Sequence, residues 1–373
     1  MTEALSRISA AGLSIWLDDL SRERFQGSLQ SMIEKRHVVG VTTNPAIFSA
    51  AISRSDLYDQ DLQALGRKGL SPAAVIRDLT ISDVRNASHH FASIFETSAG
   101  VDGRISIEVD PELAHNASAT IDEGLLLWQE VDRPNILIKV PATQEGLEAV
   151  EELTYLGISV NVTLIFTAAR YEKVIDAYFL GLERRVTEGL SIKEIHSVAS
   201  FFVSRIDTEI DARLRAMAES GESQLLTDLR GRAGVANALI AYQLFLSRFA
   251  SQRWERLQEA GGNLQRPLWA STGVKDPAYS PTLYVESLIT KDSVNTMPEA
   301  TLDAVASLPP EHGLDPIEGP TPRFAEAEEH LRTLAEIGIE IDAVGDQLEI
   351  EGVEKFVTPW RALHENVASR ISS

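Results

Sequence analysis

The feature that most restricts the fold is a regular alternation between short apolar runs and longer stretches with helical patterns. Strands that alternate with helices at this spacing form right-handed βαβ units around a parallel sheet. Eight such units predict an α/β fold of the (β/α)8 TIM barrel type. The predicted strands are residues 14–19, 38–45, 104–109, 135–140, 157–163, 195–202, 267–271 and 290–297.

Two helical regions exceed what a minimal barrel needs. One is an insert at about 206–263, and the other is a C-terminal extension at about 300–373, which contains a proline-rich surface linker at 308–322. Amphipathic helices of this kind more often pack on a barrel than bind a partner. We therefore expect residues 1–373 to form a single barrel domain.

Composition restricts the class of partner. An apolar content of 44% with 24% charged residues is typical of a soluble globular protein. The net charge of −21 repels nucleic acid and anionic membranes, so we expect neither as a partner. No run of 18 apolar residues is present, and zero cysteines exclude disulfides and thiolate metal sites. These features are compatible with a cytoplasmic protein.

Lys139 lies within the apolar strand 135–140, between Ile138 and Val140. Lysine is rarely buried completely. Two interpretations are open for this strand alone. Lys139 either extends to water or pairs with a carboxylate, or burial favours its neutral amine, which attacks a carbonyl to form a Schiff base.

The other strand ends favour the second interpretation. Because side chains alternate along a strand, residues two apart share a face. Seven predicted strands direct a polar group inward near their carboxyl ends, where the active sites of this barrel occur. The inward pairs are Trp16 and Asp18, Thr42 and Asn44, Ser106 and Glu108, Leu137 and Lys139, Asn161 and Thr163, Ser200 and Phe202, and Trp269 and Ser271.

This set combines one amine, two carboxylates, and amides and hydroxyls suited to polyols. No HExxH, glycine-rich phosphate loop or GxGxxG motif is present, so we expect no metal and no cofactor. His89 and His90 fall in a helical segment and fit a solvated face better than a metal site.

Several segments resemble the transaldolase family, in the order expected for it, and its long-chain bacterial type in particular. The resemblance implies a class I aldolase-type barrel. It also implies an enzyme that transfers dihydroxyacetone between sugar phosphates in the non-oxidative pentose phosphate pathway. The matching segments are Val41-Thr-Thr-Asn-Pro-Ala-Ile-Phe48, Ile105-Ser-Ile-Glu-Val109, Ile136-Leu-Ile-Lys-Val-Pro-Ala-Thr143, Asn161-Val-Thr-Leu-Ile-Phe166 and Ser200-Phe-Phe-Val-Ser-Arg-Ile-Asp207.

The resemblance also implies roles for matching residues. Lys139 corresponds to the Schiff-base lysine, and Asp18 to the group that takes the proton of the C4 hydroxyl. Glu108, acting through a water near Thr163, corresponds to the group that helps dehydrate the carbinolamine. Asn44 and Asn161 correspond to amides that hold the dihydroxyacetone hydroxyls, and Arg205 and Ser271 to the phosphate site. Thr42, Ser200 and Phe202 are further expected substrate contacts.

One position departs from the shorter enzymes, which carry arginine two residues after the serine, where this chain has Gly273. Lys275 is expected to substitute as a point charge, although a solvated loop lysine is the alternative. Fructose-6-phosphate aldolases, which release free dihydroxyacetone, carry glutamine at the position of Glu108 and tyrosine at that of Phe202. A barrel without catalysis should lack Lys139, Asp18 or Glu108. The sequence leaves monomer and homodimer both open.

Overall fold

The fold comes from a computed structural model, which describes residues 3–219 and 224–372. Eight parallel strands close into a barrel in which each strand pairs with its neighbour in sequence and β8 pairs with β1. The (β/α)8 prediction is confirmed. The strands are β1 (Leu13–Leu17), β2 (Val38–Val41), β3 (Arg104–Glu108), β4 (Ile136–Pro141), β5 (Val160–Ile165), β6 (Ser197–Phe202), β7 (Gln265–Ala270) and β8 (Ser293–Met297).

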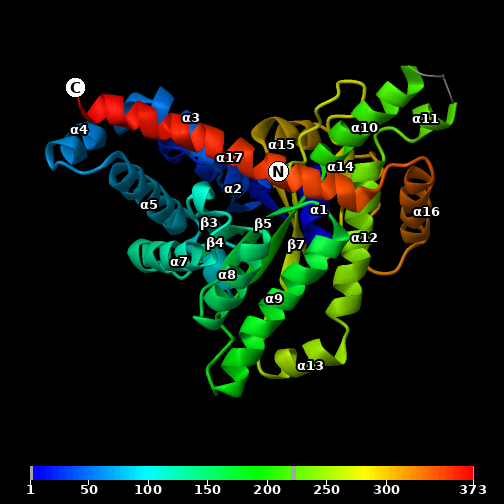
Figure 1. Cartoon of the computed structure of the whole chain (residues 1–373), viewed down its shortest axis with the longest axis horizontal. Helices are drawn as coiled ribbons and strands as arrows, with labels where there is room; N and C mark the ends of the chain where they lie inside the picture. Colours follow the sequence, from blue (N-terminus) through cyan, green and yellow to red (C-terminus); the bar gives the residue numbers. More distant parts are fainter. Residues whose placement is uncertain (1–2, 220–223, 373) are drawn as a thin grey trace.

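Helices surround the barrel and fill the two additional regions (Figure 1). The first half of the chain contains α1 (Glu3–Ala10), η1 (Arg24–Ser28), α2 (Leu29–Arg36), α3 (Pro45–Arg54), η2 (Asp56–Tyr58), α4 (Asp59–Arg67), α5 (Pro72–His90), α6 (Ala92–Thr97), η3 (Pro111–Leu113), α7 (Ala117–Val131), α8 (Gln144–Tyr155) and α9 (Ala168–Thr187). The second half contains α10 (Ser204–Glu219), α11 (Gln224–Asp228), α12 (Ala233–Arg248), α13 (Gln252–Glu259), α14 (Leu283–Ser287), α15 (Glu299–Ala306), α16 (Pro322–Glu336) and α17 (Ile341–Ile371).

Local sequence signals explain where several helices begin. The hydroxyl of Thr143 accepts a hydrogen bond from Gly146 N (3.0 Å) at the start of α8, and that of Thr167 accepts one from Arg170 N (3.1 Å) at the start of α9. Each cap satisfies a backbone N–H that the helix itself leaves without a partner. Strand β5 begins later than the predicted 157–163, because Gly157, with φ +89°, still belongs to the turn after α8.

An apolar layer fills the middle of the barrel. Trp16, Leu137, Val198, Leu268 and Val294 are all buried there. The indole of Trp16 lies against Gly40, where an added Cβ would come within 2.6 Å of the ring, so β2 requires glycine at this position. This layer separates the end where the strands finish, called the mouth below, from the end where they start, called the floor.

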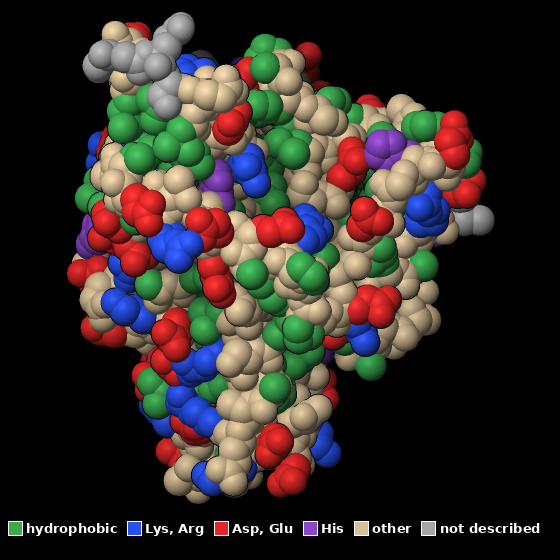
Figure 2. Space-filling model, turned by 90° about the vertical axis from the view of Figure 1, so that its right-hand side faces the viewer, with side chains coloured by type: hydrophobic (Ala, Val, Ile, Leu, Met, Phe, Trp, Pro, Cys, Tyr) green, Lys and Arg blue, Asp and Glu red, His purple; other side chains and the backbone are tan. Residues whose placement is uncertain are grey.

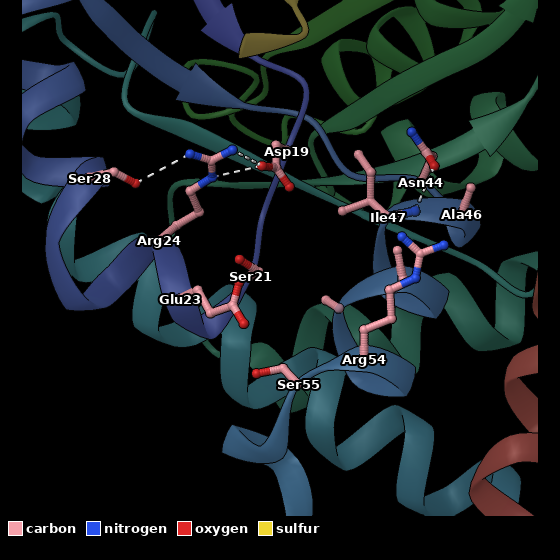
Figure 3. A pocket seen from close by; sticks show the side chains of 12 residues that line it. Asp19, Ser21, Glu23, Arg24, Ser28, Asn44, Ala46, Ile47, Arg54 and Ser55 are labelled. Carbon is pink, nitrogen blue, oxygen red and sulfur yellow. Dashed lines mark hydrogen bonds and ion pairs between the residues drawn. The ribbon is translucent and has the colours of Figure 1, made fainter. Parts of the chain in front are cut away.

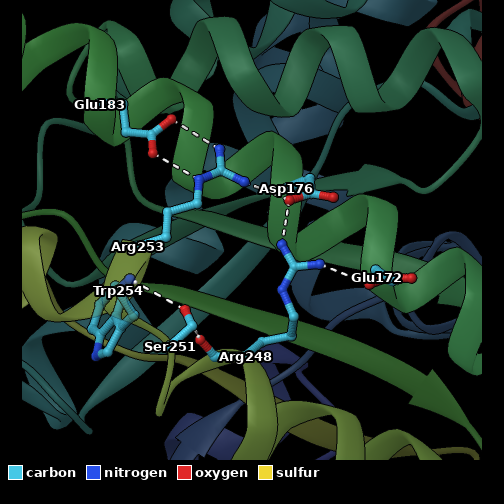
Figure 4. A network of polar contacts seen from close by, with 7 residues as sticks. All are labelled: Glu172, Asp176, Glu183, Arg248, Ser251, Arg253 and Trp254. Atoms are coloured by element: carbon cyan, nitrogen blue, oxygen red, sulfur yellow. Dashed lines mark hydrogen bonds and ion pairs between the residues drawn. The ribbon is translucent and has the colours of Figure 1, made fainter.

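The helices around β6 and β7 are joined by ion pairs. Arg248 at the end of α12 and Arg253 on α13 contact three carboxylates of α9, namely Glu172, Asp176 and Glu183 (Figure 4). Trp254, next to Arg253, is buried against Phe179 of α9 with ring centroids 5.4 Å apart. These contacts fix α13 beside the floor.

The C-terminal helix α17 crosses the mouth. In Figure 1 it runs, in red, across the top of the molecule near α3 and α4. On the face in Figure 2, acidic and basic side chains are intermixed rather than separated by sign. Within residues 3–219 and 224–372, no helix is both long and apolar enough to cross a membrane.

Candidate active site

Lys139 lies at the centre of the mouth. Its ammonium donates hydrogen bonds to Glu108 Oε1 (2.9 Å) and to the backbone oxygen of Thr43 (2.6 Å). Strand register explains the first contact, because Lys139 on β4 is paired directly with Glu108 on β3. The side chains of Lys139 and Glu108 are only 6% and 10% exposed, so this is a buried ion pair with an amine and a carboxylate in contact.

Asp18 follows β1 and lies in the same electrostatic environment. Burial raises the pKa of Asp18, while the charge of Lys139 and a hydrogen bond from Thr42 oppose that rise. The bond runs from Thr42 Oγ1 to Asp18 Oδ1 and measures 2.8 Å. The hydroxyl of Thr42 also contacts Thr296 Oγ1 at 2.5 Å. Asp18 is therefore a carboxyl group that is positioned by a hydroxyl and retains a proton more readily than an ordinary aspartate.

A chain of polar contacts orients Asn161. Ser200 Oγ donates to Asn161 Oδ1 (2.7 Å), and Asn161 Nδ2 donates to Ser106 Oγ (2.9 Å). All three side chains are buried and come from three strands. Thr163, two residues further along β5, has a buried hydroxyl with no hydrogen-bond partner among the described residues. Leaving a buried hydroxyl without a partner costs free energy. The hydroxyl of Thr163 is therefore suited to bind substrate or a reacting water.

Asn44 caps the N-terminus of α3 and lines a cavity beside the mouth. Its side-chain oxygen accepts a hydrogen bond from Ile47 N (3.0 Å), which leaves its NH2 group available. The cavity has a volume of about 630 Å³, with Arg24 and Asp19 on one side and Asn44 and Ile47 on the other (Figure 3). Asn44 thus lies at the edge of the site, whereas Asn161 lies inside it.

Arg205 is the second residue of α10, the helix that follows β6. Its guanidinium carbon lies 5.0 Å from the ring centre of Phe202, and its buried Nη1 has no hydrogen-bond partner among the described residues. Burial lowers the pKa of Arg205, and the carboxylates of Asp18 and Glu351 oppose that shift. A buried guanidinium with a free N–H is suited to an anionic ligand.

Ser271 and Lys275 differ in their relation to Arg205. The hydroxyl of Ser271 lies 2.9 Å from that of Ser204, the residue before Arg205. Lys275 is exposed and lines a different cavity, of about 280 Å³, together with Asp207, Asp211, Arg215 and Asp276. Its Nζ lies 3.8 Å from the point that a Cβ at Gly273 would occupy. Neither Arg205 nor Ser271 lines that cavity.

The prediction that Trp269 shares the inner face with Ser271 is wrong. Trp269 points toward the helices, where its Nε1 donates to Thr290 Oγ1 (2.8 Å). Leu268 and Ala270 face the interior instead. Ser271 reaches the mouth because it lies beyond the end of β7 with φ +55°, so strand alternation no longer applies to it.

Two features of the mouth were missed by sequence reasoning. Thr43 binds Lys139 through its carbonyl and donates from its hydroxyl to Glu108 Oε2 (2.8 Å). The alternation rule assigned it outward, but β2 ends at Val41, so the rule does not reach it. The other is α17, whose Phe356 ring lies 5.9 Å from Lys139 Nζ. The cavity next to Lys139 is therefore small, about 10 Å³, and is lined by Phe356, Thr163, Leu164 and others.

Comparisons with known proteins give one consistent result over almost the whole chain. The family model described as transaldolase/fructose-6-phosphate aldolase matches residues 15–367. A transaldolase of Renibacterium salmoninarum is 51% identical over 374 residues, covering 100% of this chain and 98% of the relative. A transaldolase of Mycolicibacterium smegmatis is 52% identical over 362 residues, covering 96% and 95%. Transaldolase 2 of Streptomyces coelicolor is 49% identical over 373 residues, covering 100% and 98%.

Proposed function

The chain belongs to the transaldolase/fructose-6-phosphate aldolase family, and we propose that it acts as a transaldolase with Lys139 as its Schiff-base residue. The donor is a ketose phosphate, sedoheptulose 7-phosphate or fructose 6-phosphate. The acceptor is an aldose phosphate, glyceraldehyde 3-phosphate or erythrose 4-phosphate. The observation that carries the residue assignment is the buried contact of Lys139 with Glu108, in a mouth that also contains Asp18.

Lys139 and Glu108 supply the first step. The neutral amine adds to the C2 carbonyl of the donor, and the resulting carbinolamine loses water to give a protonated imine. Glu108 contacts the ammonium directly, so it is placed to accept the proton that the amine must lose. The same carboxyl then returns a proton to the departing hydroxyl, with the free hydroxyl of Thr163 holding the water. General acid–base groups contribute about 10²- to 10⁴-fold.

Asp18 supplies the second step. Its carboxylate takes the proton of the C4 hydroxyl as the C3–C4 bond breaks, and the electron pair of that bond moves into the protonated imine. The product is an aldehyde and an enamine bound to Lys139. The aldehyde of the acceptor then captures the enamine, Asp18 returns the proton, and hydrolysis of the imine releases the new ketose phosphate.

The remaining polar groups hold the substrate. Asn161, oriented by Ser200, and the free NH2 group of Asn44 are suited to the dihydroxyacetone hydroxyls. Arg205 binds the phosphate together with Ser271, whose hydroxyl contacts Ser204. Lys275 contributes less, because it is exposed and faces several carboxylates.

Phe202 favours transfer over release. It packs against Phe166 with ring centroids 5.2 Å apart, so an apolar surface faces the mouth. Such a surface cannot orient a water to protonate the enamine, which therefore persists until an aldehyde arrives. Phe202→Tyr adds a hydroxyl that orients such a water, and we expect the ratio of free dihydroxyacetone to transferred product to rise severalfold. An unchanged ratio would show that the ring does not control partitioning.

One experiment tests the proposal as a whole. The protein is incubated with fructose 6-phosphate and erythrose 4-phosphate, and glyceraldehyde 3-phosphate and free dihydroxyacetone are measured separately. A parallel sample with fructose 6-phosphate alone is reduced with borohydride and digested. We expect glyceraldehyde 3-phosphate without matching free dihydroxyacetone, and a reduced dihydroxyacetone unit on the peptide that contains Lys139. Labelling of a different lysine would disprove the assignment.

A further inference from the structure

The floor of the barrel contains a second polar cavity, at the opposite end from Lys139. It has a volume of about 260 Å³, many times the roughly 30 Å³ that one water occupies in the liquid. Arg104, the first residue of β3, and Arg266, the second residue of β7, both line it. His196, just before β6, and Trp254 and Gln258 of α13 also line it. The lining therefore brings two positive charges together in a chain whose net charge is −21.

Both terminal nitrogens of Arg266 are engaged by neighbouring groups. It donates to Asp102 Oδ1 (3.0 Å), to Ser14 Oγ (2.8 Å) and to the backbone oxygen of Val101 (2.7 Å). The carboxylate of Asp102 also accepts from Ser14 and from the indole of Trp16. The charge of Arg266 is therefore balanced inside the floor, and both of its terminal nitrogens donate to protein groups.

Arg104 is not balanced in this way. It is 1% exposed, and its Nε and Nη1 donate to the backbone oxygens of Gly100 (2.7 Å) and Pro134 (3.3 Å). Its third nitrogen, Nη2, is buried and has no hydrogen-bond partner among the described residues. Arg104 also packs on the ring of Phe95 at 4.9 Å. No carboxylate of the described chain forms an ion pair with it.

His196 lies beside the free nitrogen of Arg104. A Cβ added at Gly100 would lie 3.2 Å from Arg104 Nη2 and 2.9 Å from His196 Nε2, so these two atoms face the same small region. Burial and the charges of Arg104 and Arg266 lower the pKa of His196 to about 3. Burial and Arg266 likewise lower the pKa of Arg104 to about 9. Two carboxylates nearby are exposed: Asp292 lines the cavity, and Glu194 acts on Arg104 through its charge.

We propose that this floor cavity binds an oxyanion, the phosphate or carboxylate group of a small metabolite, with Arg104 Nη2 as its main charged donor. A bound oxyanion accepts a hydrogen bond from the free N–H of Arg104 and balances the charge of its guanidinium. It thereby removes the cost of burying a donor without a partner and a charge without a counter-charge. His196 provides a second nitrogen on the same side, and the amide of Gln258 a third polar group at the wall. The apolar layer around Trp16 and Leu137 separates this ligand from the substrate at Lys139.

The ring of His196 is the direct reporter of binding. The full-length protein is labelled with ¹⁵N-histidine, and the His196 signals are assigned by their loss in His196→Gln. Inorganic phosphate and malonate are each titrated at constant ionic strength, with chloride as the control. Because a bound anion opposes the field of the two arginines, we expect saturable shifts of His196 and a rise of its pKa. Saturation by phosphate alone assigns a phosphate ligand, and saturation by malonate alone assigns a carboxylate.

A matched pair of substitutions tests the electrostatic basis. Gln258 is exposed on α13 and lines the cavity, so Gln258→Glu and Gln258→Lys change the charge at the wall without removing a buried contact. A unit charge near an ionic ligand changes its affinity by roughly three- to tenfold at partly exposed sites. We expect Gln258→Glu to weaken binding by that factor and Gln258→Lys to strengthen it, with unchanged turnover as the folding control. Arg104→Met should weaken binding at least tenfold.

Two results would overturn the proposal. The first is a His196 response to phosphate and malonate no larger than the response to chloride. The second is equal affinity in Gln258→Glu and Gln258→Lys, which would show that the ion does not occupy the cavity.

Discussion

The two ends of the barrel use similar residues for different purposes. At the mouth, Lys139 is paired with Glu108, while Thr163 and Arg205 retain polar atoms without partners among the described residues. At the floor, Arg266 and Asp102 form a pair in which every contact is internal. Inward polar residues alone therefore do not identify a catalytic site. Free polar atoms beside a cavity are the more informative sign, and Arg104 shows one at the floor.

The largest loss of turnover should follow removal of the amine at the mouth, because only this end of the barrel carries out the reaction. Lys139→Ala deletes the amine that forms the covalent intermediate, so we expect turnover to fall by roughly 10⁴-fold or more. Steady-state kinetics and the borohydride trap measure this loss. Lys291→Ala, at an exposed lysine near the start of β8, is the control and should keep full activity. Activity in Lys139→Ala within tenfold of the unmodified protein would contradict the assignment.

Substitutions of the two carboxyl groups at the mouth should slow different steps of the reaction. Each change should reduce turnover by about 10²- to 10⁴-fold. Asp18→Asn should slow cleavage of the C3–C4 bond while the imine still forms, and Glu108→Gln should slow imine formation itself. Rapid trapping with borohydride measures the imine, and release of the aldehyde measures cleavage. If both variants form the imine at the normal rate, the division of roles is wrong.

At the floor, removal of a charged group should lower the stability of the protein and leave its turnover unchanged. Arg266→Met leaves the carboxylate of Asp102 without its partner, and we expect the free energy of unfolding to fall by about 3 kcal/mol. Turnover of the folded fraction should be unchanged. Arg184→Met is the matched control, because Arg184 pairs with Glu151 and Glu152 at the surface, where ion pairs contribute less than about 1 kcal/mol. Urea unfolding compares them, and a large loss of turnover in Arg266→Met would contradict the separation of the two ends.

Substitution of the buried cation Arg205 should raise KM more than substitution of the exposed cation Lys275. Arg205→Ala removes charge-assisted hydrogen bonds of about 1.5–3 kcal/mol, so we expect KM for phosphorylated donors to rise about ten- to a hundredfold. Lys275→Ala should raise it less than about threefold, because Lys275 is exposed and its field is screened. Unphosphorylated acceptors are the control. Equal effects of the two variants would show that Lys275 completes the phosphate site.

The smallest expected effect is a shift in pH dependence. Asp18 must be ionised to take a proton, and burial raises its pKa, so activity should be lost as pH falls through that raised pKa. Thr42→Val removes a hydrogen bond that favours the ionised form of Asp18, and therefore raises its pKa further. We expect the acid limb of kcat/KM to move upward by about one pH unit. Thr42→Ser, which keeps the hydroxyl, should leave the limb in place.

Much of this site could be predicted from sequence because strand periodicity is a local property. Alternation correctly placed Glu108, Lys139, Asn161 and Phe202 on the inner face, since each lies inside a regular strand. It failed beyond strand ends, where dihedral angles change, as at Thr43. It also failed for β7, where an incorrect strand assignment placed Trp269 inside.

Contacts between distant segments could not be predicted in the same way. The cover that α17 places over Lys139 depends on packing between residues far apart in the chain, including Phe356 and Leu164. Helical periodicity in the tail indicates an amphipathic helix but does not indicate which surface it covers. The free nitrogen of Arg104 could not be predicted for a related reason, because it depends on how the backbone oxygens of Gly100 and Pro134 lie around the guanidinium.

The position of α17 has a consequence for how the protein is made. Arg370 in α17 donates to the backbone oxygen of Ile52 in α3 (2.6 Å), a contact between residues 318 positions apart. Translation at about 5–20 residues per second separates the synthesis of these two residues by tens of seconds. From the synthesis of Lys139 until that of Phe356 on α17, the nascent barrel has its central lysine without its cover. We therefore expect nascent chains that do not yet include α17 to lack a finished catalytic centre.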